Sequence, residues 1–331
     1  MNELIFFKKN IIIENVSSAI GYLTKSIKNF AQIIRILNHN GITKSKLFVN
    51  DDAESHNEIP IVETFFSDPY TINSAHSLVT DEFILKSVTS HLITNYYTII
   101  VGKTSNLVNK MINTLAIFMP KEKIRLSCYA IQDYFMLSPN LILQGLVTEN
   151  PEEFNSLLEA DFLFKRDYPT TIINISNKTV CRTCTGYEFV QTKEQFINHK
   201  IKFLFNNLNL SQLKILHPAN EYLNWISYSS NQPRLIKKML QELELFESEF
   251  GIKKSFIDKI LKDLNFLALN LIEYVNSKLL EASHRTEKTI KIPSKKLTKI
   301  LDISTDEDLN VVLAFAHNLK PDFFRNFIFT N

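Results

Sequence analysis

Glycine, tryptophan and cysteine are scarce in this chain of 331 residues, with six, one and three copies respectively. With 25 phenylalanines beside so few glycines, we expect well-filled cores and few glycine-hinged loops. No apolar run reaches the roughly 18 residues that a membrane-spanning helix needs. The first four residues lack the basic start and long apolar core of a secretion signal.

Charge and apolar content are ordinary for a globular protein. Apolar residues make up 45% of the chain and charged residues 22%, with a net charge of +2. A net charge this small does not indicate a nucleic-acid partner. We therefore expect a globular protein without a nucleic-acid partner.

Two of the three cysteines form one CxxC pair, Cys181 and Cys184. A zinc site needs a second pair of ligands at matching spacing, and His199, 15 residues beyond Cys184, has no partner histidine one turn later. A redox pair belongs at the start of a helix, whereas this pair follows a β-rich stretch. We interpret the spacing as chance in a turn and expect neither a metal nor a cofactor.

The N-terminal part contains one clear amphipathic helix, from Val16 to Leu37, in which apolar residues recur at spacings of three and four. Asn15 can cap its start, and a polar run from Asn38 to Gly41 stops it. Residues 50–77 are polar and interrupted by proline, so a linker is predicted there.

Residues 78–191 alternate between helical and strand-like segments. Helices are predicted around residues 83–92 and 107–115, the second capped by Ser105 and ended by Pro120. Strands are predicted at residues 97–101, at 126–130, from 141 onward and at 170–175. This alternation favours an α/β fold, with a central sheet and helices packed on its faces.

Residues 192–331 are predicted to be helical. Pro233 can open one helix, and Ser255 with Asp258 has capping-box spacing before a second apolar face at residues 256–275. Thr305 and Asp308 repeat that spacing before a helix that Lys320-Pro321 closes.

Gly102-Lys103-Thr104 lies between a predicted strand and a predicted helix, as in a phosphate-binding P-loop. The full motif needs a glycine five residues before Gly102, where this chain has Tyr97. Without that glycine a tight strand-to-helix turn is the better interpretation. Nucleotide binding at these residues is kept as a further hypothesis, after those given below.

Other candidate catalytic groups are weaker still. Ser90-His91 and Ser283-His284 are adjacent pairs, whose side chains point in different directions on a helix. Glu152-Glu153 follows a proline and is better explained as a solvated helix start. We name no catalytic, cofactor-binding or metal-binding residue.

Two surface features have two interpretations each. Residues 285–299 contain six basic residues against one glutamate, which suits either a solvated connector or contact with anionic lipid. The connector is favoured. Trp225 suits a core position or an aromatic contact with a partner, and the core is favoured.

Three groups of short motifs follow one another in order from about residue 78 to the C-terminus. They are Ile100-Val101-Gly102 with Val108-Asn109-Lys110 and Thr114-Leu115; Gln144-Gly145-Leu146 with Tyr168-Pro169-Thr170-Thr171; and Ala268-Leu269-Asn270-Leu271-Ile272-Glu273-Tyr274 with Asp308-Leu309-Asn310, Leu319-Lys320-Pro321 and Phe327-Ile328-Phe329. On these residues the chain resembles the DENN-module family, in particular the chromosome nine open reading frame seventy-two family of longin–DENN proteins.

The resemblance implies a four-part organisation. It consists of a longin or upstream-DENN remnant at residues 1–49, a linker at 50–77, a central DENN α/β subdomain at 78–191 and an all-helical downstream DENN subdomain at 192–331. It also implies a regulator of a small Rab-like GTPase, at most a guanine-nucleotide exchange factor, in autophagy and endolysosomal trafficking. The alternative is a non-enzymatic scaffold subunit of a DENN heterodimer whose activity resides in its partner.

The implied partners are the GTPase, a second longin–DENN protein of the Smith–Magenis-region candidate type and a WD-repeat subunit. The implied location is cytoplasmic, with peripheral association to endosomes, lysosomes or autophagosomes. A complete longin domain has a five-stranded sheet, whereas little more than the helix from Val16 precedes the linker. We therefore expect a reduced longin region or a truncated gene model, which weakens longin-mediated pairing. The chain also ends soon after Phe329, which weakens the expectation of a WD-repeat partner.

Overall fold

The computed structural model describes residues 64–66, 81–131, 135, 137–138, 140–150, 153–154, 157–158, 160–164, 166–206, 223–228, 232–246, 250–283, 290–321, 323–325 and 327–330. The helix predicted at residues 16–37 and most of the predicted linker lie outside these residues. Residues 63–331 form one compact unit, which therefore contains both the α/β part and the C-terminal helices.

A six-stranded sheet forms the centre of this unit, in the order β2-β3-β1-β4-β5-β6. The strands are β1 Thr98–Gly102, β2 Ser127–Cys128, β3 Leu143–Val147, β4 Thr171–Asn174, β5 Thr179–Thr183 and β6 Leu223–Trp225. The central strand β1 pairs in parallel with both β3 and β4. β5 and β6 extend the sheet through antiparallel pairs. Every residue of β1 is buried, because elements on both faces of the sheet cover this strand.

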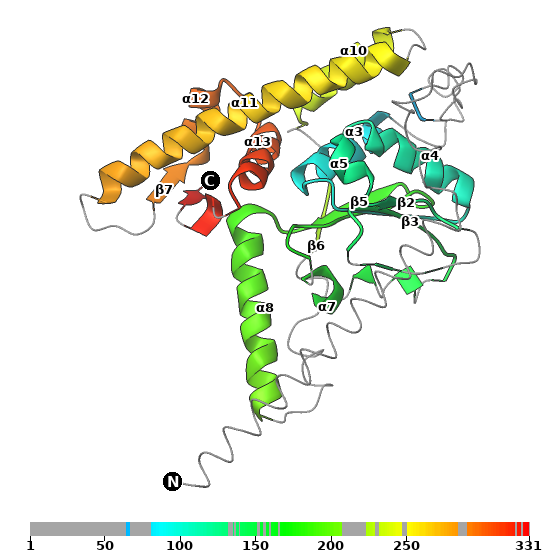
Figure 1. Ribbon diagram of the computed structural model, residues 1–331, viewed down its shortest axis with the longest axis horizontal. Helices are drawn as coiled ribbons and strands as arrows, with labels where there is room; N and C mark the ends of the chain where they lie inside the picture. Colours follow the sequence, from blue (N-terminus) through cyan, green and yellow to red (C-terminus); the bar gives the residue numbers. More distant parts are fainter. Residues whose placement is uncertain are drawn as a thin grey trace. The chain divides into compact units, whose positions relative to one another are not determined.

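The two faces of the sheet are covered by different elements. Helices α3 (Asp81–Ile93), α4 (Ser105–Ala116) and α5 (Lys121–Ile124) lie on one side (Figure 1). The short helix α7 (Ala160–Leu163) covers the other side, where Leu157 and Leu163 join a buried cluster with Ile99 and Val101 of β1. Side chains in a strand alternate between faces, so Ile100 and Gly102 point toward α4.

Two glycines allow α4 to pack close to the sheet. A Cβ atom on Gly102 would lie 2.8 Å from Cγ2 of Val108. A Cβ atom on Gly145 would lie 2.6 Å from Cδ1 of Ile112 and 2.9 Å from the backbone nitrogen of Ala130. Both positions therefore need glycine for close approach.

The C-terminal part packs around one buried helix, α13 (Asp306–Leu319). The other elements are α8 Gly186–Asn206, α10 Arg234–Leu245, α11 Phe250–Ser283, α12 Ser294–Leu301, the 3-10 turn η2 Phe323–Arg325, and the strands β7 Ile290–Pro293 and β8 Phe327–Thr330. α13 contacts α11 on one side and α3 on the other, so it joins the helices to the α/β part (Figure 1). Its buried residues include apolar positions all round the helix, as expected for an element enclosed on several sides.

The predicted fold class is confirmed: a mixed α/β protein with a central sheet, flanking helices and a mainly helical C-terminal part. The C-terminal part is not all helical, because β6 and the parallel pair β7–β8 interrupt it. The predicted domain boundaries stay predictions. Among the described residues, no helix combines the length and the apolar character needed to traverse a bilayer.

The helix caps are confirmed in one case and wrong in two. The hydroxyl of Thr305 accepts a hydrogen bond from the backbone N–H of Asp308, as predicted. Ser255 caps nothing, because α11 begins five residues earlier at Phe250. The cap position of α4 is Thr104 instead of Ser105, and its side chain makes no capping hydrogen bond.

Candidate protein-binding site where the sheet meets the C-terminal helices

The turn between α3 and β1 holds two residues in the left-handed region, Asn95 with φ 53° and Tyr96 with φ 76°. The N–H of Tyr96 donates to His91 O at 2.8 Å and the N–H of Asn95 donates to Leu92 O at 3.2 Å, which is a Schellman motif. Asparagine adopts this conformation readily, whereas an aromatic residue rarely does. The rings of His91 and Phe315 hold Tyr96 in place, with centroids 5.4 and 6.4 Å away.

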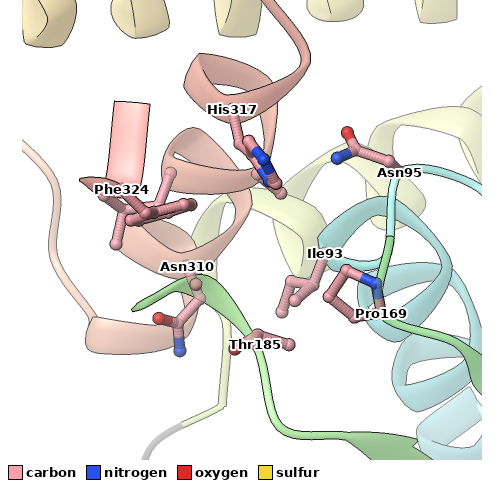
Figure 2. Close-up of a pocket in the computed structure, with 10 residues that line it drawn as sticks. Ile93, Asn95, Pro169, Thr185, Asn310, His317 and Phe324 are labelled. Carbon is pink, nitrogen blue, oxygen red and sulfur yellow. The ribbon is translucent and has the colours of Figure 1, made fainter. Parts of the chain in front are cut away.

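A pocket opens beside this turn, between the end of α3 and α13 (Figure 2). Its empty volume is about 310 Å³, including open solvent at its mouth. It is lined by Ile93, Asn95, Pro169, Thr185, Gly186, Asn310, Leu313, Ala314, His317 and Phe324. Its walls are therefore mostly apolar, with a few polar groups, as is usual in binding sites.

Two carboxamides in this pocket have no hydrogen-bond partner among the described residues. Asn95 is only 2% exposed, and Figure 2 shows its amide directed across the pocket toward His317. Asn310, on α13, lies on the opposite side of the pocket. A carboxamide offers two N–H donors and a carbonyl acceptor, the same groups as a peptide backbone. The two amides therefore keep hydrogen-bonding capacity that a partner segment could use.

Aromatic rings form one wall of the pocket and continue away from it. The ring of His317 lies 5.3 Å from that of Tyr168 and 5.1 Å from that of Phe324. Tyr168 in turn stacks on Tyr97, which directly precedes β1, at 5.2 Å. This row of rings connects the sheet to α13 and η2, so it fixes the two sides of the pocket relative to each other.

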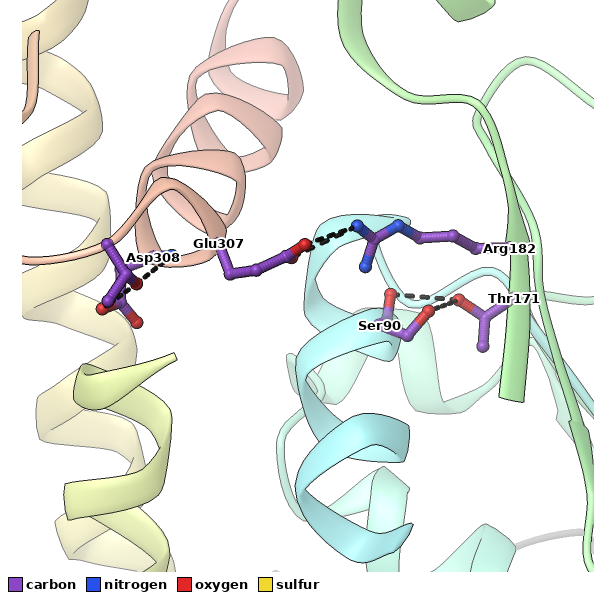
Figure 3. Close-up of polar contacts among 6 residues, drawn as sticks. Ser90, Thr171, Arg182, Glu307 and Asp308 are labelled. Atoms are coloured by element: carbon purple, nitrogen blue, oxygen red, sulfur yellow. Dashed lines mark hydrogen bonds and ion pairs between the residues drawn. The ribbon is translucent and has the colours of Figure 1, made fainter. Parts of the chain in front are cut away.

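An ion pair also connects the sheet to α13. Nη2 of Arg182, on β5, donates to both carboxylate oxygens of Glu307 at 3.1 and 3.2 Å (Figure 3). The Arg182 side chain is 11% exposed and that of Glu307 is 21% exposed. Separating the sheet from α13 would leave each of these mostly buried charges without its partner, which is unfavourable. The ion pair therefore helps to hold α13 against the sheet.

Asp308 joins a third element to α13. Its carboxylate accepts hydrogen bonds from the backbone N–H groups of Arg234 and Leu235, the first two residues of α10, at 3.0 and 3.1 Å. It also accepts a hydrogen bond from the hydroxyl of Thr305 at 2.7 Å. Burial raises the pKa of Asp308, and these hydrogen bonds oppose that shift. Asp308 thus caps a helix other than its own.

A polar layer lies between α3 and the sheet. The hydroxyl of Ser90 forms a hydrogen bond with that of Thr171 of β4 at 2.7 Å (Figure 3). The hydroxyl of Thr94 forms another with Thr171 at 2.9 Å. Nδ1 of His91 lies 2.8 Å from the hydroxyl oxygen of Thr98. Burial, together with the nearby charge of Lys123, lowers the pKa of His91 to about 3. The imidazole is therefore neutral at physiological pH.

Ser90 and His91, one of the adjacent pairs considered as catalytic, have separate partners in this layer, so they do not form a nucleophile–base pair. Glu152 and His284 lie outside the described residues. Gly102-Lys103-Thr104 forms the predicted tight turn, with Gly102 closing β1 and Thr104 preceding α4. Both Lys103 and Thr104 are exposed.

The two cysteines of the CxxC lie in different apolar clusters. Cys181 packs with Ile172 and Leu223 on the sheet, whereas Cys184 packs with Phe189 and other phenylalanines. Burial raises the pKa of Cys181 to about 12 and that of Cys184 to about 11. Such thiols are poor nucleophiles and poor metal ligands.

The prediction that Trp225 belongs to the core is wrong. Trp225 is 58% exposed and lies on β6, the last strand of the sheet. The basic stretch is also more than a connector, because residues 290–301 form β7 and α12.

The chain is similar to known proteins of one family. The model of the C9orf72-like protein family matches residues 4–188, more than half of the chain. The chain belongs to the C9orf72-like protein family.

Curated relatives extend the similarity beyond that range. The human guanine nucleotide exchange factor C9orf72 is 26% identical over 82% of this chain and 56% of its own length. The mouse and rat homologues are each 25% identical over 96% of this chain and 65% of their own length. The chain therefore spans less than two thirds of the length of these C9orf72 proteins.

Several motif residues that carried the resemblance have clear structural roles here. Gly102 and Gly145 permit close packing of α4. The side-chain amide of Asn109 accepts a hydrogen bond from Ala130 N at 2.8 Å and donates one to Ala130 O at 3.2 Å, two residues beyond the end of β2. Asn95 was not predicted as a site residue, although an asparagine between an apolar helix and a strand is a known helix-ending signal.

Proposed function

We propose that this chain is a DENN-type regulator that binds a small Rab-like GTPase and accelerates its guanine-nucleotide exchange. The pocket between α3 and α13 carries the proposal, because it offers two unpartnered amides and one aromatic wall without a reactive pair of side chains. Exchange needs no acid or base. It needs a surface that binds the nucleotide-free GTPase more tightly than the nucleotide-bound form.

The family supports the same proposal, since the human, mouse and rat relatives are named guanine nucleotide exchange factors. By the same resemblance we propose action in autophagy and endolysosomal trafficking, with peripheral association to endosomes, lysosomes or autophagosomes. A second longin–DENN protein and a WD-repeat subunit are the proposed partners in a complex.

Release of a fluorescent GDP analogue from a panel of Rab-like GTPases tests the exchange activity. We expect the purified chain, alone or with a DENN partner, to accelerate release from at least one GTPase by about ten-fold or more. Unchanged release rates across the whole panel, with and without the partner, would contradict it.

The alternative is a scaffold subunit whose partner holds the activity. Large exposed apolar side chains favour it, namely Trp225 on β6 and Phe266 on the outer face of α11, which are 58% and 64% exposed. Affinity purification separates the two proposals. A scaffold is recovered in stoichiometric amount with a second DENN protein and shows no exchange activity by itself.

A further inference from the structure

The helix α12 has two sharply different faces. Ser294, Leu297 and Leu301 are buried and recur at spacings of three and four, so they form the inner face. The outward face carries Lys295, Lys296, Lys299 and Ile300, all of them exposed. On a helical projection these four residues fall within one arc opposite the buried face.

This outward face is not neutralised. Among the described residues, no carboxylate lies within 4 Å of any of its three lysines, in contrast to Lys238 and Lys278, which have acidic partners. Lys291, on the preceding strand β7, is exposed and unpaired in the same way. Asp302, at the C-terminal cap of α12, is the one acidic residue of this segment from Lys291 to Asp302.

The face is held rigidly on the fold. β7 pairs in parallel with β8, from Ile290 opposite Phe327 to Pro293 opposite Thr330. Pro293 then precedes the first turn of α12, and α12 packs against α11 and α13. Figure 1 shows α12 beside α11, away from the six-stranded sheet. The lysines are therefore presented together by an ordered element.

We propose that the outward face of α12, with Lys291, binds the anionic surface of a lipid bilayer. We call Lys291, Lys295, Lys296, Lys299 and Ile300 the basic face. Its charge complements anionic headgroups, and Ile300, 46% exposed, is placed to enter the boundary with the acyl chains.

Lysine chemistry favours a bilayer over an acidic protein as the occupant. The ammonium group is a compact, mobile point charge, whereas arginine gives the fixed two-pronged geometry that suits a particular carboxylate. Lysine is also depleted from protein–protein interfaces. The basic face contains lysine and no arginine, which suits a fluid layer of many headgroups.

This inference gives a structural basis to the peripheral membrane association proposed above, yet it does not depend on nucleotide exchange. Sedimentation of the full chain with phosphatidylcholine vesicles, with and without about 30% phosphatidylserine, tests it. We expect binding to the anionic vesicles alone, and we expect added salt to weaken it. Exchange is measured separately in solution, so either proposal can fail without the other.

Charge reversal identifies the surface. The variant Lys295→Glu/Lys296→Glu/Lys299→Glu is expected to lower the partition coefficient by about a hundred-fold or more, since each lysine near the headgroups contributes about five-fold. Its matched control is Lys237→Glu/Lys259→Glu/Lys262→Glu, which makes the same charge change at exposed lysines of α10 and α11. The control is expected to retain most of the vesicle binding. The variant Ile300→Ser is expected to lower the partition coefficient several-fold.

Three results would overturn the proposal. The first is that the wild-type chain does not bind anionic vesicles, and the second is that it binds neutral and anionic vesicles equally. The third is that the two triple variants lose equal amounts of vesicle binding. Polyglutamate provides the remaining comparison. If the wild-type chain binds polyglutamate through the basic face and does not bind vesicles, then the ligand of the basic face is an acidic protein segment. All variants change exposed side chains, and circular dichroism verifies that they fold.

Discussion

The carboxylate of Asp308 caps α10 while the backbone N–H of the same residue completes the cap of α13. The spacing from Thr305 to Asp308 predicted the local half of this arrangement, because a capping box is a short-range pattern. The hydrogen bonds to Arg234 and Leu235 were not predictable, since they join residues more than 70 positions apart.

Replacing Asp308 by alanine should therefore destabilise the protein by about 2–3 kcal/mol. The change removes the cap of α10 and leaves two backbone N–H groups without their acceptor. Asp308→Asn should lose less, because asparagine also caps helices. Urea unfolding measures the difference. The exposed Asp306→Ala is the control, and an equal loss in both alanine variants would refute this role.

His91 should make the stability of the protein fall in mild acid. Its pKa is about 3 in the folded state and about 6.5 when unfolded, so below pH 6.5 the unfolded chain binds the proton more readily. The free energy of unfolding should therefore drop by about 2 kcal/mol between pH 7 and pH 5 from this residue.

The variant His91→Gln isolates this contribution, since glutamine does not titrate. Urea unfolding of both proteins at pH 7 and pH 5 should show a smaller drop in the variant by about 2 kcal/mol. Identical pH dependence in the two proteins would show that His91 is not buried in its neutral form.

At the scale of single elements, β1, β4 and α4 were predictable, whereas the length of β2 and the strands β5 to β8 were not. The run from Tyr97 to Val101 is apolar and β-branched, and the apolar face of α4 has a helical period, so both patterns are local. β2 is only two residues long, because the amide of Asn109 takes both backbone groups of Ala130. α11 starts before its predicted cap, and Lys253 and Lys254 near its start donate to the distant carbonyl oxygens of Phe66 and Ile117.

The packing of α4 on the sheet should depend on Gly145. Gly145→Ala should destabilise the protein by about 1–3 kcal/mol, because the added methyl group meets Ile112, Val108 and the backbone of Ala130. Chemical denaturation measures the loss. Adding Val108→Ala should recover part of it, so the double variant should lose less than the sum of the single variants. Strict additivity would contradict the close contact.

At the scale of the whole molecule, the fold class followed from alternating helices and strands, whereas the pocket did not. The lining residues come from α3, from the segments before β4 and α8, from α13 and from η2. Their meeting depends on long-range contacts such as Arg182 with Glu307 and the ring row through His317. Nothing in the local pattern around Asn95 or Asn310 indicates that the two amides share one pocket.

The pocket makes a direct prediction about the proposed GTPase. The variant Asn95→Gly/Asn310→Ala removes both amides while keeping each backbone conformation favourable, since glycine tolerates positive φ and alanine suits a helix. The variant Asn106→Ala/Asn224→Ala is the matched control, at exposed asparagines of α4 and β6. Thermal unfolding should show all three proteins folded.

Calorimetric titration of each protein with a nucleotide-free Rab-like GTPase tests the central claim most directly. Losing two hydrogen-bonding groups should weaken binding to the pocket variant by about 10- to 100-fold, while the control should bind as tightly as the wild type. Equal affinity of the wild type and the pocket variant would contradict the assignment of this pocket as the GTPase-binding site.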